Sequence, residues 1–169
     1  MNSKKIAALS MLIALSLILF MVESLIPPLF PIAPYVKIGL SNVVMIFVLI
    51  IYGEKESLIF MLAKNFLGCL ILGNWYAFPF NISGSFFSLI LMMALYRYCF
   101  PKISIISISI AGAITSNIVR TAVGAIIMQT AGLLLDLPVV VIISVGAGIL
   151  IGILTIMLIK YLPDKIINR

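Results

Sequence analysis

The sequence contains no histidine and few acidic residues, and these absences exclude several classes of function. Without histidine there is no imidazole metal ligand, no imidazole general base and no Ser-His-Asp triad. Aspartate occurs only as Asp136 and Asp164, so no aspartate cluster is present to hold magnesium and a diphosphate. No Gly-x-x-x-x-Gly-Lys-Ser/Thr loop is found, so ATP hydrolysis is not expected. We expect no catalytic residue, no metal and no cofactor.

Cysteine and charge are also scarce. Cys69 and Cys99 lie in or beside apolar segments and predict no disulfide framework. Only 9% of residues are charged and 64% are hydrophobic, with a mean hydropathy of +1.33. This composition excludes an ordinary soluble domain and predicts an all-α membrane protein, with residues 1–169 forming a single integral membrane domain.

Crossing the hydrocarbon core takes roughly 20 apolar residues. Six segments approach that length, and they cover residues 6–26, 36–52, 57–73, 82–99, 103–129 and 139–162. The first would be a cleavable signal peptide in another context, but no small-x-small cleavage site follows it. We therefore predict six transmembrane helices. The connections 27–36, 74–81 and 130–138 are apolar or aromatic, which suits segments that fold over the bundle.

The distribution of basic residues predicts the topology. One side of the predicted bundle collects Lys4, Lys5, Lys55, Arg97, Lys102, Lys160, Lys165 and Arg169. The other side has only Lys37, together with Asp136. Because basic loops stay in the cytoplasm, both termini are predicted to be cytoplasmic in a multi-pass plasma-membrane protein. The net charge of +6 is scattered over segment ends, which favours membrane topology over nucleic-acid binding.

Four ionisable side chains lie inside or at the edge of the apolar runs: Glu23, Lys37, Lys64 and Arg120. A charge at membrane depth is costly, so it usually faces a cavity, a partner charge or a substrate. An internal ion pair, such as Arg120 with Glu23, is one interpretation. One carboxylate cannot neutralise three cations, however, so we favour a pocket for a small anionic molecule.

Polar neighbours extend this pocket. The guanidinium of Arg120 suits a carboxylate or phosphate because it offers a two-pronged hydrogen-bonding fork. Gly39 and Gly84 lie near predicted helix starts, where free amides favour an anion. The candidate substrate-binding residues are Arg120, Lys64, Lys37, Glu23, Asn42, Asn117, Asn81 and Trp75.

The first predicted helix has a stripe of small residues. Ala7, Ser10 and Ala14 fall on one face, with Glu23 roughly opposite. Such a stripe allows close approach of another helix, either within the bundle or in a partner protein.

Several motifs carry a family resemblance. Glu23-Ser24-Leu25-Ile26-Pro27-Pro28 and Val36-Lys37-Ile38-Gly39-Leu40-Ser41-Asn42 resemble the bacterial Gx transporter family, also labelled component I of heptaprenyl diphosphate synthase. Asn81-Ile82-Ser83-Gly84-Ser85 and Ala111-Gly112-Ala113-Ile114-Thr115-Ser116-Asn117 resemble two further motifs of that family. Ser116 and Arg120 stand where the family often has His and Gln.

The resemblance implies a fold similar to the substrate-binding S components of energy-coupling factor transporters. Those six-helix proteins capture a vitamin-like solute on the outer side and work with a transmembrane coupling subunit and two ATPase subunits. The stripe of Ala7, Ser10 and Ala14 resembles their contact with the coupling subunit.

The working hypothesis is a capture subunit for a small, partly apolar anion such as an isoprenoid or quinone precursor. One alternative is a non-catalytic accessory subunit of a prenyl or quinone synthesis complex. A self-sufficient channel or exchanger is another, and a membrane enzyme is the least supported.

Overall fold

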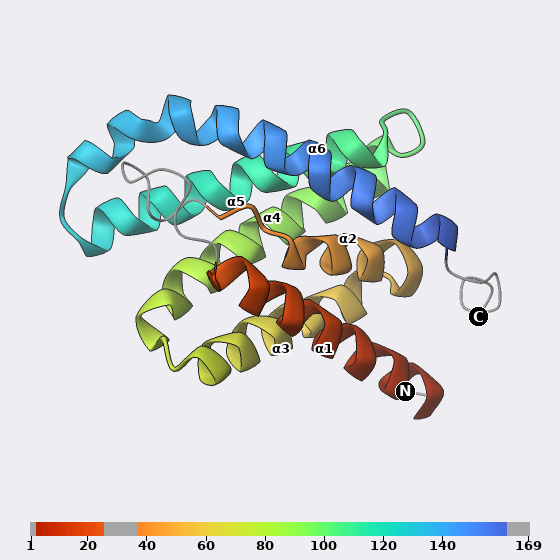
Figure 1. The fold of residues 1–169 in the computed structure, drawn as a ribbon. Helices are drawn as coiled ribbons and strands as arrows, with labels where there is room; N and C mark the ends of the chain where they lie inside the picture. The colour runs from red at the N-terminus through yellow and green to blue at the C-terminus, as the bar shows by residue number, and fades with distance from the viewer. Residues whose placement is uncertain (1–2, 26–36, 162–169) are drawn as a thin grey trace.

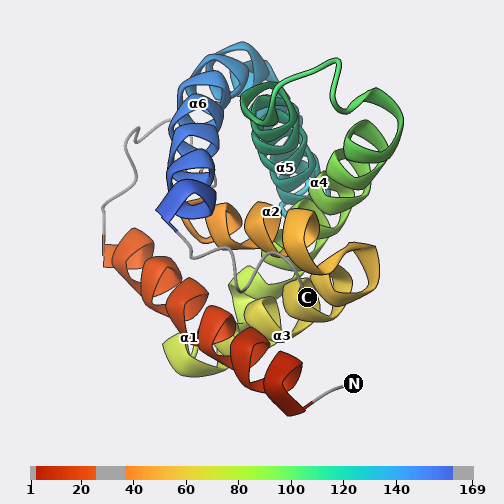
Figure 2. The same cartoon turned by 90° about the vertical axis from the view of Figure 1, so that its right-hand side faces the viewer.

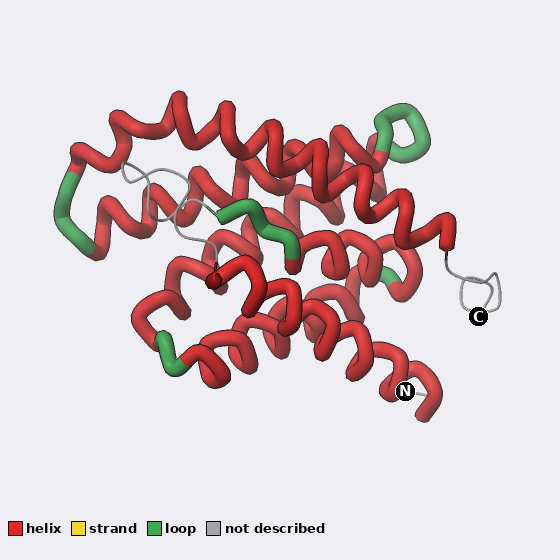
Figure 3. Tube along the Cα trace, in the orientation of Figure 1, coloured by secondary structure: helices red, strands yellow, loops and turns green. Residues whose placement is uncertain are grey.

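The computed structural model describes residues 3–25 and 37–161 of the chain (Figure 1). Over these residues it is all-helical, as predicted, with short connections between the elements (Figure 3). The α-helices are α1 (Ser3–Leu25), α2 (Ser41–Tyr52), α3 (Glu54–Leu72), α4 (Phe78–Cys99), α5 (Ile105–Ile127) and α6 (Leu137–Tyr161). Two 3-10 helices, η1 (Trp75–Ala77) and η2 (Ala131–Asp136), occupy places predicted to be connections.

Five of the six predicted helices begin and end within a few residues of the observed bounds. The prediction for the second helix, 36–52, is wrong at its start, because α2 begins at Ser41. Gly39 has a φ of 80°, outside the right-handed helical region, so the helix cannot extend back through it. The predicted connection 74–81 is shorter than expected because α4 already begins at Phe78. Its first turn accommodates Pro79, a position where proline costs no hydrogen bond.

The short helix α2 lies at the centre of the bundle, with the other helices around it (Figure 2). Every residue from 43 to 49 is at most 6% exposed. This helix is apolar on all sides because all its sides contact protein. Its 12 residues extend about 18 Å, less than the about 30 Å of a hydrocarbon core.

Four helical segments of the described chain are long and apolar enough to cross a membrane. They run over Lys5–Leu25, Trp75–Cys99, Ile105–Ile127 and Gly132–Tyr161. The helix α3 is not among them, since it carries Glu54, Lys55, Glu56 and Lys64. Large apolar side chains cover much of the outer surface, including Met11, Ile126 and Ile142. The protein is therefore a membrane-embedded helical bundle.

The two ends of the bundle differ in character. The start of α1, the end of α6 and the α2–α3 and α4–α5 connections lie at one end (Figure 1). At this end Lys5 forms a hydrogen-bonded ion pair with Glu56, and Nη1 of Arg97 lies 3.8 Å from Oε1 of Glu54. The connections through η1 and η2 lie at the opposite end. The predicted cover at 27–36 and the basic tail residues Lys165 and Arg169 lie outside the described residues.

Candidate functional site

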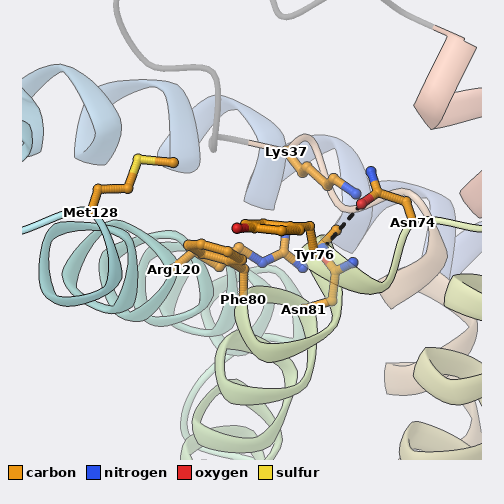
Figure 4. Close-up of a pocket in the computed structure, with 8 residues that line it drawn as sticks. Lys37, Asn74, Tyr76, Phe80, Asn81, Arg120 and Met128 are labelled. Carbon is orange, nitrogen blue, oxygen red and sulfur yellow. Dashed lines mark hydrogen bonds between the residues drawn. The ribbon is translucent and has the colours of Figure 1, made fainter.

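A cavity of about 280 Å³ opens at the end of the bundle that holds η1 and η2. The helices α4 and α5, the 3-10 helix η1 and the segment before α2 meet around it. Its lining residues are Lys37, Asn74, Tyr76, Ala77, Phe80, Asn81, Arg120 and Met128 (Figure 4). Two cations, two amides and a mostly apolar remainder thus share one small space.

Lys37 reaches the cavity from the segment between α1 and α2. Its backbone is held on both sides by Asn117 of α5. The N–H of Lys37 donates to Asn117 Oδ1 at 3.4 Å, and Asn117 Nδ2 donates to the carbonyl of Lys37 at 3.2 Å. Asn117 Nδ2 also donates to Ser144 Oγ at 2.9 Å, which ties this segment to α6. The ammonium of Lys37 lies 4.6 Å from the ring centre of Phe20, a cation–π contact.

Arg120 comes from the middle of α5, one turn after Asn117, and is 6% exposed. Its Nε is buried and has no hydrogen-bond partner among the described residues. A buried donor without a partner is unfavourable, and a ligand that accepts a hydrogen bond would remove that cost. In Figure 4 its guanidinium lies beneath the ring of Tyr76, while Lys37 points toward Asn74 and Asn81.

Glu23 is buried near the end of α1, opposite the exposed face of that helix. Its carboxylate accepts a hydrogen bond from the backbone N–H of Gly39. The amide of Gly39, which was predicted to bind an anionic ligand, therefore binds the carboxylate of Glu23. Within the described part of the chain, the ion pairs are those at the opposite end of the bundle, so an ion pair between Glu23 and Arg120 is not formed.

Lys64 is 2% exposed and does not line the cavity. Its ammonium donates to Asn42 Oδ1 at 2.9 Å and to Ser41 Oγ at 3.3 Å. Lys64 and Asn42 therefore connect α3 to the first turn of α2. Lys64 and Asn42 were predicted to bind the substrate, but neither of them lines the cavity.

The amide and aromatic residues divide in a similar way. Asn81 lines the cavity, with its Nδ2 3.9 Å from Cys69 Sγ. Trp75 does not line it, being half-exposed and packed edge-on against Phe66. Its neighbours Asn74 and Tyr76 do line it and were not singled out from the sequence. The uncharged aromatic character of 74–80 was the signal that could have identified them.

Gly84 lies inside α4, past the first turn, and not at a helix start as predicted. Backbone N–H groups beyond the first turn already donate hydrogen bonds within the helix, so the predicted contact between the Gly84 amide and an anion is wrong.

Positive charge exceeds negative charge around the cavity. Lys37, Lys64 and Arg120 face a single buried carboxylate, that of Glu23, which attracts all three of them. Arg120 also repels Lys37 and Lys64. The described residues leave this charge uncompensated, and an anion would balance it.

The small residues of α1 lie on its exposed side. Ala7, Ser10 and Ala14 are all exposed, whereas Leu9, Ser16, Phe20 and Glu23 face the bundle. The interpretation that Ser10 and Ala14 pack within the bundle is therefore wrong.

Comparison with curated proteins and with solved structures found no match. Residues 12–158 match the family described as heptaprenyl diphosphate synthase component I. This match covers most of the chain and confirms the resemblance carried by the motifs around Glu23, Lys37, Gly84 and Asn117. The chain belongs to the heptaprenyl diphosphate synthase component I family, the Gx family of membrane helical proteins.

Proposed function

We propose that this protein is the substrate-capture subunit of an energy-coupling factor type uptake transporter. In this proposal the chain crosses the plasma membrane six times and keeps both termini in the cytoplasm. The cavity then opens on the outer side. The basic residues Lys5, Lys55, Arg97 and Lys102 at the opposite end favour this orientation, because basic residues concentrate on the cytoplasmic side.

The observation that carries the proposal is the cavity in which Lys37 and Arg120 meet without an acidic partner on its wall. Asn74 and Asn81 add polar groups, while Tyr76, Phe80 and Met128 make the rest apolar. We infer a ligand with an anionic group and an apolar body. A cavity of about 280 Å³ suits a small molecule of vitamin, isoprenoid-precursor or quinone-precursor size.

The predicted site residues then have two kinds of role. Arg120 and Lys37 bind the anionic group, and Asn81 orients it. Asn117 holds the wall in place through the backbone of Lys37, and Glu23 does so through the N–H of Gly39. Lys64 holds the start of α2 through the side chains of Ser41 and Asn42. Trp75 does not line the cavity and packs against Phe66 and Phe78.

Energy for uptake comes from partners in this proposal. The sequence has no P-loop, so a coupling subunit and two ATPase subunits would supply it. The exposed face of α1 with Ala7, Ser10 and Ala14 is the proposed contact for the coupling subunit, because small residues allow close helix approach in a membrane.

Native mass spectrometry of the purified protein tests the proposal directly. A small apolar anion is expected to travel with the wild type and to be lost from Arg120→Ala. The matched control is Arg97→Ala, which removes an exposed arginine at the other end. Equal retention by Arg120→Ala and the wild type would contradict an anion site at the cavity.

The family description favours a second candidate, an accessory subunit of a prenyl diphosphate synthase. Copurification from native membranes separates the two. The transport proposal expects ATPases and a coupling subunit with the protein, whereas the accessory proposal expects a soluble synthase subunit.

A further inference from the structure

Gly84 on α4 faces the side chain of Arg120. A Cβ atom built on Gly84 would lie 2.8 Å from both Cγ and Nε of Arg120, and 2.9 Å from the backbone oxygen of Ser116. Such distances are too short for carbon, so the lack of a side chain at Gly84 leaves the volume in which Arg120 lies.

The backbone of α4 does not itself require glycine there. Gly84 is inside a regular helix and has no left-handed φ, unlike Gly39 or Gly73. Glycine in a helix interior costs roughly 0.5–1 kcal/mol relative to alanine. Close approach by a neighbour is therefore the reason that the structure offers for this residue.

A second glycine in the same interface behaves differently. On α5, a Cβ at Gly112 would meet Met92 and Ser88 of α4, and Ser88 Oγ donates to the Gly112 carbonyl at 2.8 Å. There the space is filled by ordinary packing residues of the opposite helix. At Gly84 it is filled by the stem and Nε of the arginine that lines the cavity.

We propose that Gly84 is a positioning residue for Arg120. Its missing side chain lets the arginine stem lie flat against α4, which directs the guanidinium to the cavity wall and keeps the stem out of the cavity. Any larger residue at position 84 pushes Arg120 into the space that the ligand would occupy. The relevance of this position to ligand binding rests on the proposed function, but the placement of Arg120 can be measured without a ligand.

Nuclear magnetic resonance of the full chain in detergent tests this proposal through the arginine Nε–H signals. The chain has Arg97, Arg120 and Arg169, and Arg120→Lys assigns the signal that disappears. In the wild type the buried Arg120 Nε–H exchanges with solvent more slowly than that of exposed Arg97. In Gly84→Ala we expect the Arg120 signal to shift and its exchange with solvent to accelerate by about tenfold or more, because the Nε–H group leaves its buried position.

Gly146→Ala is the matched control. A Cβ at Gly146 of α6 meets nothing within 4 Å, so the Arg120 signal stays in place. An unchanged Arg120 signal in a folded Gly84→Ala protein overturns the proposal. That result would leave the anion site untouched, since the site is tested separately by Arg120→Ala.

A folding defect in Gly84→Ala is also informative. The double variant Gly84→Ala/Arg120→Ala removes the Cγ and Nε contacts but keeps the contact with the Ser116 oxygen. Recovery of a monodisperse, cooperatively melting protein in the double variant supports the proposal. Failure of both variants assigns the clash to the α5 backbone and overturns it.

Discussion

At the residue scale, two buried cations, Lys64 and Arg120, and the partly buried Lys37 have different surroundings. Lys64 has two oxygen partners from α2, Lys37 has an aromatic ring, and Arg120 keeps a buried Nε without a partner. Only the last two line the cavity. The difference comes from tertiary contacts with α1, α2 and α4, and residue type alone did not reveal it.

Replacing Glu23 with Gln tests the charge balance. The amide oxygen can still accept from Gly39, but the negative charge that attracts Lys37, Lys64 and Arg120 is lost. We expect the ligand-free protein to melt at a lower temperature and the ligand to stabilise it more strongly than it stabilises the wild type. Thermal unfolding in detergent, with and without the copurified molecule, measures both effects. Glu54→Gln at the opposite end is the control, and identical melting of Glu23→Gln and the wild type would contradict the prediction.

Asn117→Ala tests the anchor of Lys37. The change leaves the backbone groups of Lys37 and the hydroxyl of Ser144 without their amide partner. We expect a loss of about 1–3 kcal/mol in unfolding free energy and weaker ligand binding. Thr115→Ala is the comparison, because the Thr115 hydroxyl donates to the Ala111 carbonyl of its own helix. A smaller loss for Asn117→Ala than for Thr115→Ala would show that the anchor does not stabilise the wall.

At the element scale, long apolar runs predicted the bounds of the long helices well, whereas the start of the short buried helix α2 was predicted less well. The bounds of α1, α5 and α6 follow from hydropathy, since each lies in a segment long and apolar enough to cross a membrane. The start of α2 depends on the backbone of Gly39, which adopts a φ of 80° and is bonded to Glu23. A contact between residues that far apart in the sequence leaves no periodic signal. The site shows the same division: Lys37 and Arg120 were identifiable as charges in apolar runs, whereas the positions of Asn74 and Tyr76 depend on how η1 folds back.

The exposed face of α1 gives a prediction at this scale. Ala14→Leu adds volume on the proposed partner contact without touching the core, because Ala14 is exposed. We expect an unchanged melting temperature and a loss of the copurifying coupling subunit. Ile142→Phe on the exposed side of α6 is the control for added bulk at a lipid-facing position. Undiminished copurification with Ala14→Leu would move the partner contact away from this face.

At the scale of the whole molecule, the proposed orientation can be measured in intact cells. In a background with Cys69 and Cys99 replaced, Tyr76→Cys marks the cavity end and Lys102→Cys the opposite end. A membrane-impermeant maleimide is expected to label Tyr76→Cys from outside and to label Lys102→Cys only after the cells are opened. The reverse pattern would invert the topology and place the cavity on the cytoplasmic side.

The enclosure of α2 has a consequence for biogenesis. At 12 residues it is too short to be retained in the bilayer by its own hydropathy, and its seven innermost residues meet no lipid. We therefore expect this segment to become enclosed only after α4, α5 and α6 have been inserted around it. A ribosome-bound chain truncated before α4 should expose 41–52 to proteolysis, whereas the finished chain protects it.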